Sequence, residues 1–354
     1  MDYTTIYPNA PQNKVEESKK VLKELIEKYD IDIIPIGNGT ASRETEFLVA
    51  ELLKEINKKV YYTIVSEAGA SVYSASKLAT EEYPDINVSI RGAISIGRRL
   101  QDPLAELVKI DPKSIGVGQY QHDLNQGKLG ESLKNVVEDC VNSVGVDLNT
   151  ATPSLLQYVS GISSTVSKNI VQYREENGKF TNRKQLKEVK RLGDKVFEQC
   201  AGFLRISHGD QPLDNTSVHP ESYEITMRLI EKLGYSKEDI VAGKLRNIEE
   251  RLLEYGNGDS NNLTIKLKEI ADELEVGLPT LKDIIKEIKK PGRDPREEMP
   301  KPIFRSDVLK MEDLKLDMVM TGTVRNVVDF GAFVDIGVKQ DGLVHVSQLS
   351  NKFV

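Results

Sequence analysis

The chain has 354 residues, of which 39% are hydrophobic and 29% charged, and its net charge at neutral pH is −7. This is the composition of a water-soluble globular protein, and the length predicts two to four domains, because one hydrophobic core rarely organises so many residues. No apolar run is long enough to cross a bilayer, and the first residues lack the basic start and apolar block of a secretory signal, so no membrane partner is expected.

Cysteine and histidine give no sign of a metal or disulfide framework. Cys140 and Cys200 lie in helix-like stretches, which favours buried, reduced thiols. The four histidines are scattered without metal-ligand spacing. We therefore expect a cytoplasmic protein with no metal and no cofactor.

The first part of the chain has the pattern of an α/β domain. An amphipathic helix at 15–29 precedes an apolar run at 31–37, which ends in glycine and predicts a buried strand. A turn at 37–46 leads into a helix, and a second strand at 60–66 is followed by further helical sequence. Strands and helices that alternate at this spacing indicate a parallel or mixed sheet covered by helices.

Four stretches of this α/β part carry a family resemblance: GNGTASRETE (37–46), SEAGASVYSAS (66–76), RRLQDPLAELVKIDP (98–112) and IGVGQYQHD (115–123). They resemble the ribonuclease-H-like (YqgF) domain of Tex proteins, which is related to Holliday-junction resolvases. In active nucleases of that fold, carboxylates from separate elements hold two metal ions. Glu67 matches one such position and Asp102 is a second candidate, but the acid of the first strand has no counterpart. The resemblance therefore implies a vestigial site with no catalytic residue and no metal.

From about residue 128 the pattern becomes helical, and the charge changes with it. Residues 155–206 carry ten Lys and Arg against five Asp and Glu, a local charge of +5, so the rest of the chain sums to −12. A basic module inside an acidic chain can hold phosphates locally.

Two helical hairpins within this basic stretch lie about thirty residues apart. One turns at Ser160-Gly161-Ile162 and the other at Leu192-Gly193-Asp194. They resemble tandem helix-hairpin-helix units, in which backbone N–H groups at each turn face a phosphate. The residues that match or could add charge are Gly161, Gly193, Lys168, Lys190, Arg191 and Lys195. The family usually has two glycines per hairpin, whereas Ser163 and Arg191 each replace one of them here, and a hairpin used only for packing is the alternative.

The helical region that follows, 209–290, includes a stretch around Val276-Gly277 that is similar to a helix-turn-helix, and its apolar spacing indicates packing. Four prolines among many charges then mark 291–302 as a linker between domains. The sequence after the linker alternates valine, phenylalanine and glycine and is β-like up to residue 354.

The segment 319–350 carries the strongest motif. It reads as three strands, with Gly331 and Gly342 expected to permit tight bends. It closely resembles the RNA-binding OB fold of the S-one type, which normally has five strands, so we expect a truncated domain. The resemblance places Phe330, Phe333 and His345 at base-contacting positions and Arg325 as a weaker phosphate contact. Aromatic side chains can stack on unpaired bases, although one phenylalanine could instead fill the barrel.

These resemblances occur in the order found in Tex proteins and imply the following domains: a partial ribonuclease-H-like domain (1–127), tandem helix-hairpin-helix units (128–208), a helical region (209–290), a linker (291–302) and a truncated OB fold (303–354). The predicted fold is multidomain: an α/β piece, then all-α regions, then a β piece. The resemblance implies a non-enzymatic transcription accessory factor that binds single-stranded or structured RNA, DNA and RNA polymerase. A resolvase-type nuclease and a protein-binding adaptor to RNA polymerase are the alternatives.

Overall fold

The structure, a computed structural model, describes residues 2–255, 263–289, 314–336, 338 and 340–349. The predicted linker, 291–302, lies outside the described residues, as does the side chain of Arg325. The chain divides into two compact units, one formed by 1–68, 86–100 and 302–354, the other by 69–85 and 101–301. Across the described ranges, no helix has the length and apolar character needed to span a membrane.

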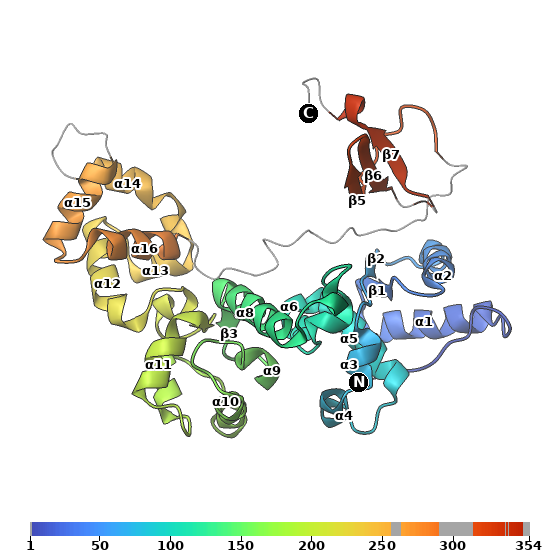
Figure 1. Ribbon diagram of the computed structural model, residues 1–354, viewed down its shortest axis with the longest axis horizontal. Helices are drawn as coiled ribbons and strands as arrows, with labels where there is room; N and C mark the ends of the chain where they lie inside the picture. Colours follow the sequence, from blue (N-terminus) through green and yellow to red (C-terminus); the bar gives the residue numbers. More distant parts are fainter. Residues whose placement is uncertain (1, 256–262, 290–313, 337, 339, 350–354) are drawn as a thin grey trace. The chain divides into compact units, whose positions relative to one another are not determined.

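The first unit contains a two-stranded parallel sheet with helices packed on it (Figure 1). Its elements are α1 (Val15–Tyr29), β1 (Ile33–Gly37), α2 (Ser42–Lys54), β2 (Tyr61–Val65) and most of α5 (Val88–Gln101). Ile36 of β1 and Tyr62 of β2 pack with Val49 of α2. Ile26 of α1 packs with Leu52 of α2. The predicted α/β character of this part is confirmed.

Short helices open the second unit and lead into one long helix. They are α3 (Ala70–Ser74), α4 (Lys77–Glu82), α6 (Pro103–Leu107), α7 (Pro112–Ile115), η1 (Gln121–Asp123) and α8 (Gln126–Val144). A buried lysine joins several of them: Lys109 Nζ lies 2.9 Å from the Glu82 carboxylate and 3.1 Å from that of Glu106. The same ammonium lies 5.2 Å from the centre of the Tyr73 ring. A fully buried cation requires such partners, because desolvation without them is costly.

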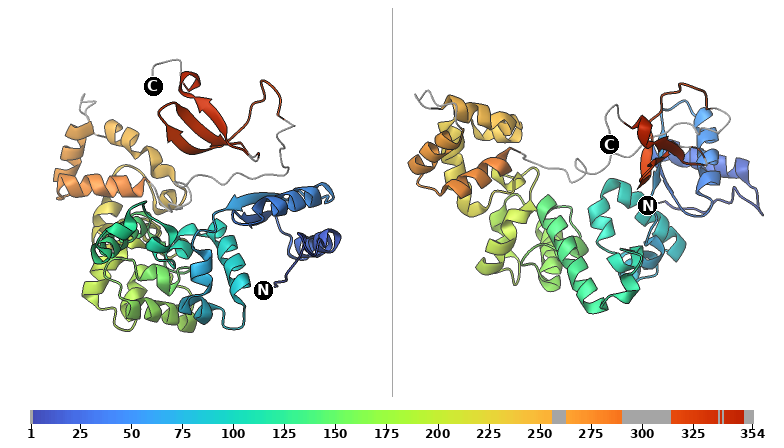
Figure 2. Two further views of the ribbon diagram at one scale, coloured as in Figure 1. Left: turned by 45° about the vertical axis from the view of Figure 1, so that its right-hand side comes forward. Right: turned by 45° about the horizontal axis from the view of Figure 1, so that its top comes forward.

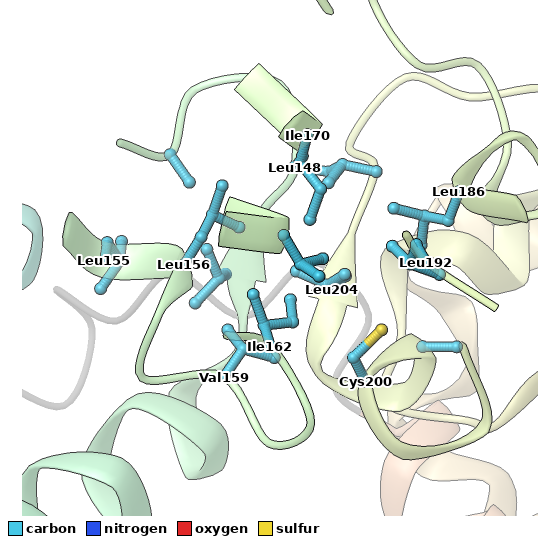
Figure 3. Close-up of a cluster of buried hydrophobic side chains, with 14 of the residues drawn as sticks. Leu148, Leu155, Leu156, Val159, Ile162, Ile170, Leu186, Leu192, Cys200 and Leu204 are labelled. Carbon is cyan, nitrogen blue, oxygen red and sulfur yellow. The ribbon is translucent and has the colours of Figure 1, made fainter. Parts of the chain in front are cut away.

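Two short helical hairpins follow α8. Their elements are β3 (Val146–Asp147), α9 (Pro153–Leu156), α10 (Ser164–Asn177), η2 (Arg183–Glu188), α11 (Asp194–Cys200), η3 (Ala201–Phe203) and β4 (Leu204–Arg205). Figure 3 shows Leu156, Ile162 and their neighbours on one side of a shared core, and Leu186 and Leu192 on the other, with Leu204 between them. The parallel β3–β4 pair was not expected, because two-residue strands leave no periodic signal in the sequence.

The remaining helices of the second unit form a bundle, coloured yellow to orange in Figure 1. They are η4 (Pro212–Asn215), η5 (Pro220–Ser222), α12 (Tyr223–Lys232), α13 (Lys237–Val241), η6 (Lys244–Asn247), α14 (Ile248–Glu254), α15 (Leu263–Glu273) and α16 (Leu278–Ile288). Their apolar faces share one core that includes Leu229, Ile270 and Ile285. The predicted role of this region in packing agrees with that core.

A buried arginine ties the bundle to the hairpins. The side chain of Arg183 is 1% exposed. Its guanidinium donates hydrogen bonds to the carbonyl oxygens of Leu204 (2.6 Å), Thr216 (2.5 Å) and Val218 (2.8 Å) and to the Tyr223 hydroxyl (2.7 Å). That hydroxyl in turn donates to the carboxylate of Asp214 at 2.5 Å, and the Arg183 backbone N–H donates to the other oxygen of that carboxylate. The segment between hairpins and bundle is therefore fixed by charge-assisted bonds.

The last described strands form one antiparallel sheet in the order β5 (Thr323–Val328), β6 (Gly331–Asp335), β7 (Gly342–His345), followed by η9 (Val346–Gln348) (red in Figure 2). A Cβ on Gly331 would lie 2.3 Å from the carbonyl oxygen of Val344, so the close approach of β7 requires glycine there. Gly342 begins β7 and has neither a left-handed backbone nor a crowded Cβ position, so neither feature requires glycine there.

The two cysteines differ in burial. Cys200 is fully buried in the hairpin core, and burial raises the pKa of its thiol to about 12. Cys140 of α8 is exposed, so the prediction that both thiols are buried is wrong. Helix-like sequence fixes the element but not which of its faces a single residue occupies.

Candidate nucleic-acid interface

The two hairpins are an internal repeat with a spacing of thirty residues. Leu156 corresponds to Leu186 and Val159 to Val189, and these residues occupy equivalent places in the shared core. At the turns, Gly161 has φ +78° and its counterpart Arg191 has φ +67°. The second hairpin thus keeps the left-handed backbone of the first with an arginine in the glycine position. That conformation costs a non-glycine residue about 1–2 kcal/mol.

Each hairpin contacts the second helix of the other repeat. Asn169 of α10 donates a hydrogen bond from Nδ2 to the carbonyl oxygen of Lys190 at 2.7 Å. Its counterpart, Gln199 of α11, lies against the first hairpin, where a Cβ on Gly161 would be 2.7 Å from the Gln199 Cβ. Gly161 is therefore fixed both by its backbone angle and by this contact.

The two turns differ in what they leave for a ligand. At the first turn the Ser160 N–H donates to Asn142 Oδ1 at 3.1 Å, and the Ser163 hydroxyl caps α10 by accepting from the N–H of Val166. At the second turn, no hydrogen bond within the described residues engages the backbone N–H of Lys190, the counterpart of Ser160, whereas the N–H groups of Gly193 and Asp194 are unengaged like those of their counterparts in the first repeat. The second turn thus keeps one more N–H donor that an anion can accept from than the first turn does.

The exposed net charge of residues 155–206 is smaller than their total net charge, because some of the arginines are not exposed. Arg183 and Arg205 are buried, and Arg174 donates to two backbone carbonyls. In residues 155–206, all of which are described, seven Lys and Arg side chains and five carboxylates are exposed, a net charge of +2 instead of +5. The predicted cationic residues Lys168, Lys190, Arg191 and Lys195 are all among the exposed ones. Three of these four belong to the second hairpin, so the positive charge is concentrated there.

A polar groove, which the sequence did not predict, lies beside the second hairpin. It encloses about 550 Å³. It is lined by Thr165, Asn169, Gln172, Tyr173, Glu176, Asn177, Glu188, Lys190 and Arg191. The residues of α10 among them recur every three or four positions, which is the signal that could have identified one polar face of that helix.

The β5–β7 sheet gathers aromatic side chains on one face. Phe333 of β6 is directly opposite Leu343 of β7, and Gly331 is opposite His345. Since alternate residues share a face, Phe333, Leu343 and His345 lie on the same side. The ring of Phe330, which is 51% exposed, meets the ring of Phe333 edge to face at 6.3 Å between centroids.

The other positions on this face follow from the register. Asn326 of β5 is opposite Phe333 and shares its face. His345 is exposed, and its Nδ1 lies 2.9 Å from the Ser347 hydroxyl, which orients the ring. Arg325 lies in β5 next to Asn326, and its side chain is outside the described part. Asn326 and the half-exposed Leu343 were missed by sequence reasoning, because strand register cannot be read from one strand alone.

The two vestigial carboxylates have structural surroundings. Glu67 follows β2, and its backbone N–H donates to Asn38 Oδ1 at 3.0 Å. A Cβ on Gly39 would clash with the Glu67 carboxylate, so glycine at this turn leaves the room that the Glu67 side chain occupies. Arg99 of α5 holds the loop by donating to the carbonyl oxygens on either side of Glu67.

Asp102 is the N-cap of α6 and accepts from the N–H of Ala105 at 3.0 Å. In the part of the chain that the structure describes, no group of three His, Cys, Asp or Glu could hold a metal ion.

Family models match four successive parts of the chain. They are the Tex protein YqgF-like domain (1–101), the helix-hairpin-helix motif (141–205), the HHH domain (211–296) and the S1 RNA binding domain (313–354). The transcriptional accessory protein Tex of Neisseria gonorrhoeae is 50% identical over 100% of this chain and 44% of its own length. The chain belongs to the Tex family. The predicted order of an α/β part, helical hairpins and an RNA-binding β part in this Tex-family chain is confirmed.

Other relatives of this Tex-family chain come from distant organisms. YdcI of Bacillus subtilis is 57% identical over 99% of the chain and 47% of its own length. The human S1 RNA-binding domain-containing protein 1 is 38% identical over 98% of the chain and 39% of its own length. The chain thus spans less than half the length of each of these three relatives.

Proposed function

We propose that this chain is a non-enzymatic, nucleic-acid-binding part of a transcription accessory factor. The observation that carries the proposal is the exposed face of the β5–β7 sheet, where Phe333, Leu343 and His345 lie side by side and Phe330 adjoins them. Such a face can stack successive unpaired bases without reading their sequence, because every base has a π-face. The S1 RNA binding domain matched at 313–354 supports single-stranded or structured RNA as its ligand.

The second hairpin is proposed to bind the phosphate backbone of DNA. Its unengaged N–H groups at Gly193 and Asp194 lie between the exposed cations Lys190, Arg191 and Lys195. Backbone donors and long basic side chains contact phosphates and carry no base information, so binding here is independent of sequence. The first hairpin contributes less, since Asn142 already occupies one of its N–H groups.

The salt dependence of binding tests the hairpin assignment. Each phosphate neutralised on duplex DNA contributes about −0.9 to the slope of log affinity against log salt. Lys190→Ala with Arg191→Ala should flatten that slope for all sequences alike. The matched control, Lys179→Ala with Lys184→Ala, removes two exposed lysines of the same repeat that lie away from the turn and should leave the slope nearly unchanged. Equal effects of the two double variants, or a loss confined to one DNA sequence, would contradict the assignment.

RNA polymerase is proposed as a protein partner on narrower grounds. The name of the gonococcal relative includes the words transcriptional accessory protein. The chain outside 155–206 carries a charge of −12, which suits a basic protein surface.

The resolvase-type nuclease is not proposed, because Asp102 caps a helix and the Glu67 carboxylate is packed against a glycine turn.

A further inference from the structure

A groove formed by α14, α15 and α16 in the helical bundle has an apolar floor and charged edges. It encloses about 330 Å³. Leu252, Leu267 and Ile285 line it and are almost completely buried, so they form its floor, whereas its charged side chains are more exposed. The residues that line this α14–α16 groove are Glu249, Leu252, Leu263, Leu267, Lys282, Ile285, Lys286 and Lys289.

The three lysines of the groove share one face of α16 with Ile285. Positions 282, 285, 286 and 289 recur at helical spacing, which places their side chains on the same side of the helix. Ile285 is 5% exposed, whereas Lys282 and Lys286 are exposed. An apolar position is therefore bordered by cations in both directions along the helix. Because lysine stems are apolar, they extend the floor while their ammonium groups remain in water.

The positive charge at the groove is only partly neutralised. The Nζ of Lys289 lies 2.9 Å from the carboxylate of Glu249. Lys282 and Lys286 form no ion pair with a carboxylate of the described residues, and the two acidic residues of α16 itself do not line the groove. Three lysines against one glutamate give the groove a net charge of +2. Unpaired cations beside an apolar surface favour a ligand that carries negative charge.

The lining of the groove favours a peptide over a nucleic acid. Unpaired bases bind proteins by stacking on aromatic rings, and the described residues that line this groove include no aromatic side chain. An aliphatic floor instead receives the apolar face of an amphipathic helix, whose acidic side chains can pair with basic edges. The residues between α14 and α15, 256–262, are glycine, asparagine, aspartate and serine, so the chain itself offers no apolar side chain there.

We propose that the α14–α16 groove binds an acidic amphipathic helix of a partner protein. An aliphatic side chain of that helix lies on the floor formed by Leu252, Leu267 and Ile285, and its carboxylates pair with Lys282 and Lys286. The proposal goes beyond nucleic-acid binding, because it gives the helical bundle a protein ligand of its own.

Two labelled peptides test the apolar part of the proposal on the full chain by fluorescence anisotropy. One is a helical peptide with leucine at every third or fourth position and glutamate between the leucines, and the other has serine in place of each leucine. The leucine peptide should bind at least about tenfold more tightly, because burial of even one leucine contributes that much. Equal binding of the two peptides, or no binding of the leucine peptide, would overturn the proposal.

Substitution of exposed lysines tests the charged part. Lys282→Glu with Lys286→Glu should weaken binding of the leucine peptide by about tenfold or more, since like charges then face each other. The matched control, Lys237→Glu with Lys268→Glu, makes the same change of charge at two exposed lysines of the bundle that do not line the groove. It should stay within about twofold of the parent, because solvent and salt screen distant charges. Equal losses in the two double variants would contradict the assignment to this groove.

Two further measurements separate a partner protein from other occupants. Single-stranded RNA and duplex DNA should bind both double variants alike, and a loss of nucleic-acid binding confined to Lys282→Glu with Lys286→Glu would overturn the proposal in favour of a nucleic acid. A peptide with the sequence of residues 303–314, which is partly basic, should bind less tightly than the leucine peptide. The reverse order would overturn the partner helix by assigning the groove to this chain itself.

Discussion

Substitution of Arg183 should destabilise the second unit more than any surface change in the hairpins. Arg183→Met retains most of the buried apolar contact but leaves four oxygen acceptors, three of them in buried bonds, without their donor. The Tyr223 hydroxyl, which donates to the carboxylate of the 2% exposed Asp214, also loses its own donor. Breaking a buried charged network by removing one partner costs about 3–5 kcal/mol, which is a large share of the about 5–15 kcal/mol that stabilises a typical domain.

Urea unfolding followed by circular dichroism measures the effect. With a slope of about 2 kcal/mol per molar urea, the midpoint of the Arg183→Met variant should fall by about 2 M. Tyr223→Phe removes one hydroxyl of the same network and should cost about 1–2 kcal/mol. Lys184→Met also removes a positive charge, from the exposed neighbouring position, and should stay within about 0.5 kcal/mol of the parent. A loss below about 1 kcal/mol for Arg183→Met would refute the reasoning, because water would then be replacing the guanidinium.

Three further substitutions test other parts of the chain. Phe333→Ala should weaken single-stranded RNA binding by roughly 1–3 kcal/mol in a filter-binding assay, whereas Val327→Ala, on the opposite face of the sheet, should not; equal losses would argue against stacking. Arg191→Gly should raise the unfolding free energy by about 1 kcal/mol by relieving the left-handed backbone and should weaken duplex DNA binding, and a destabilised variant would contradict the strain. With magnesium or manganese and branched DNA, the chain should show no cleavage above a Glu67→Ala control, so cleavage that this substitution abolishes would restore the nuclease alternative.

The positions of strands and turns could be predicted from the sequence better than the contacts between side chains. The strands at 33–37 and 61–65 and the two hairpin turns were predictable, because apolar periodicity and glycine are local signals. The exposed charge of the hairpin module could not be read from the count, since Arg183 and Arg205 are buried against partners far along the chain. The resemblance placed Arg191 at a glycine position, but arginine itself gives no local sign of the left-handed backbone found there.

Only some residues of the aromatic face of the β5–β7 sheet could be predicted from the sequence. Phe333 and His345 were found as motif residues, but Leu343 and Asn326 join them only through the pairing of three strands. Register is a property of the assembled sheet, and a shift by one residue would turn every side chain to the opposite face. Motif spacing therefore identified part of the surface, and the strand pairing completed it.

Each of the two repeats contacts the turn of the other, so the two halves of the tandem resemble the two subunits of a symmetric dimer joined in one chain. A single repeat of about thirty residues is too short to fold alone, and its turn would lack the partner helix that Asn169 or Gln199 supplies. An isolated repeat could meet this need only by pairing with a second copy of itself, as in an isologous association. Within one chain the two copies need not be identical, and here one turn has Arg191 where the other has Gly161.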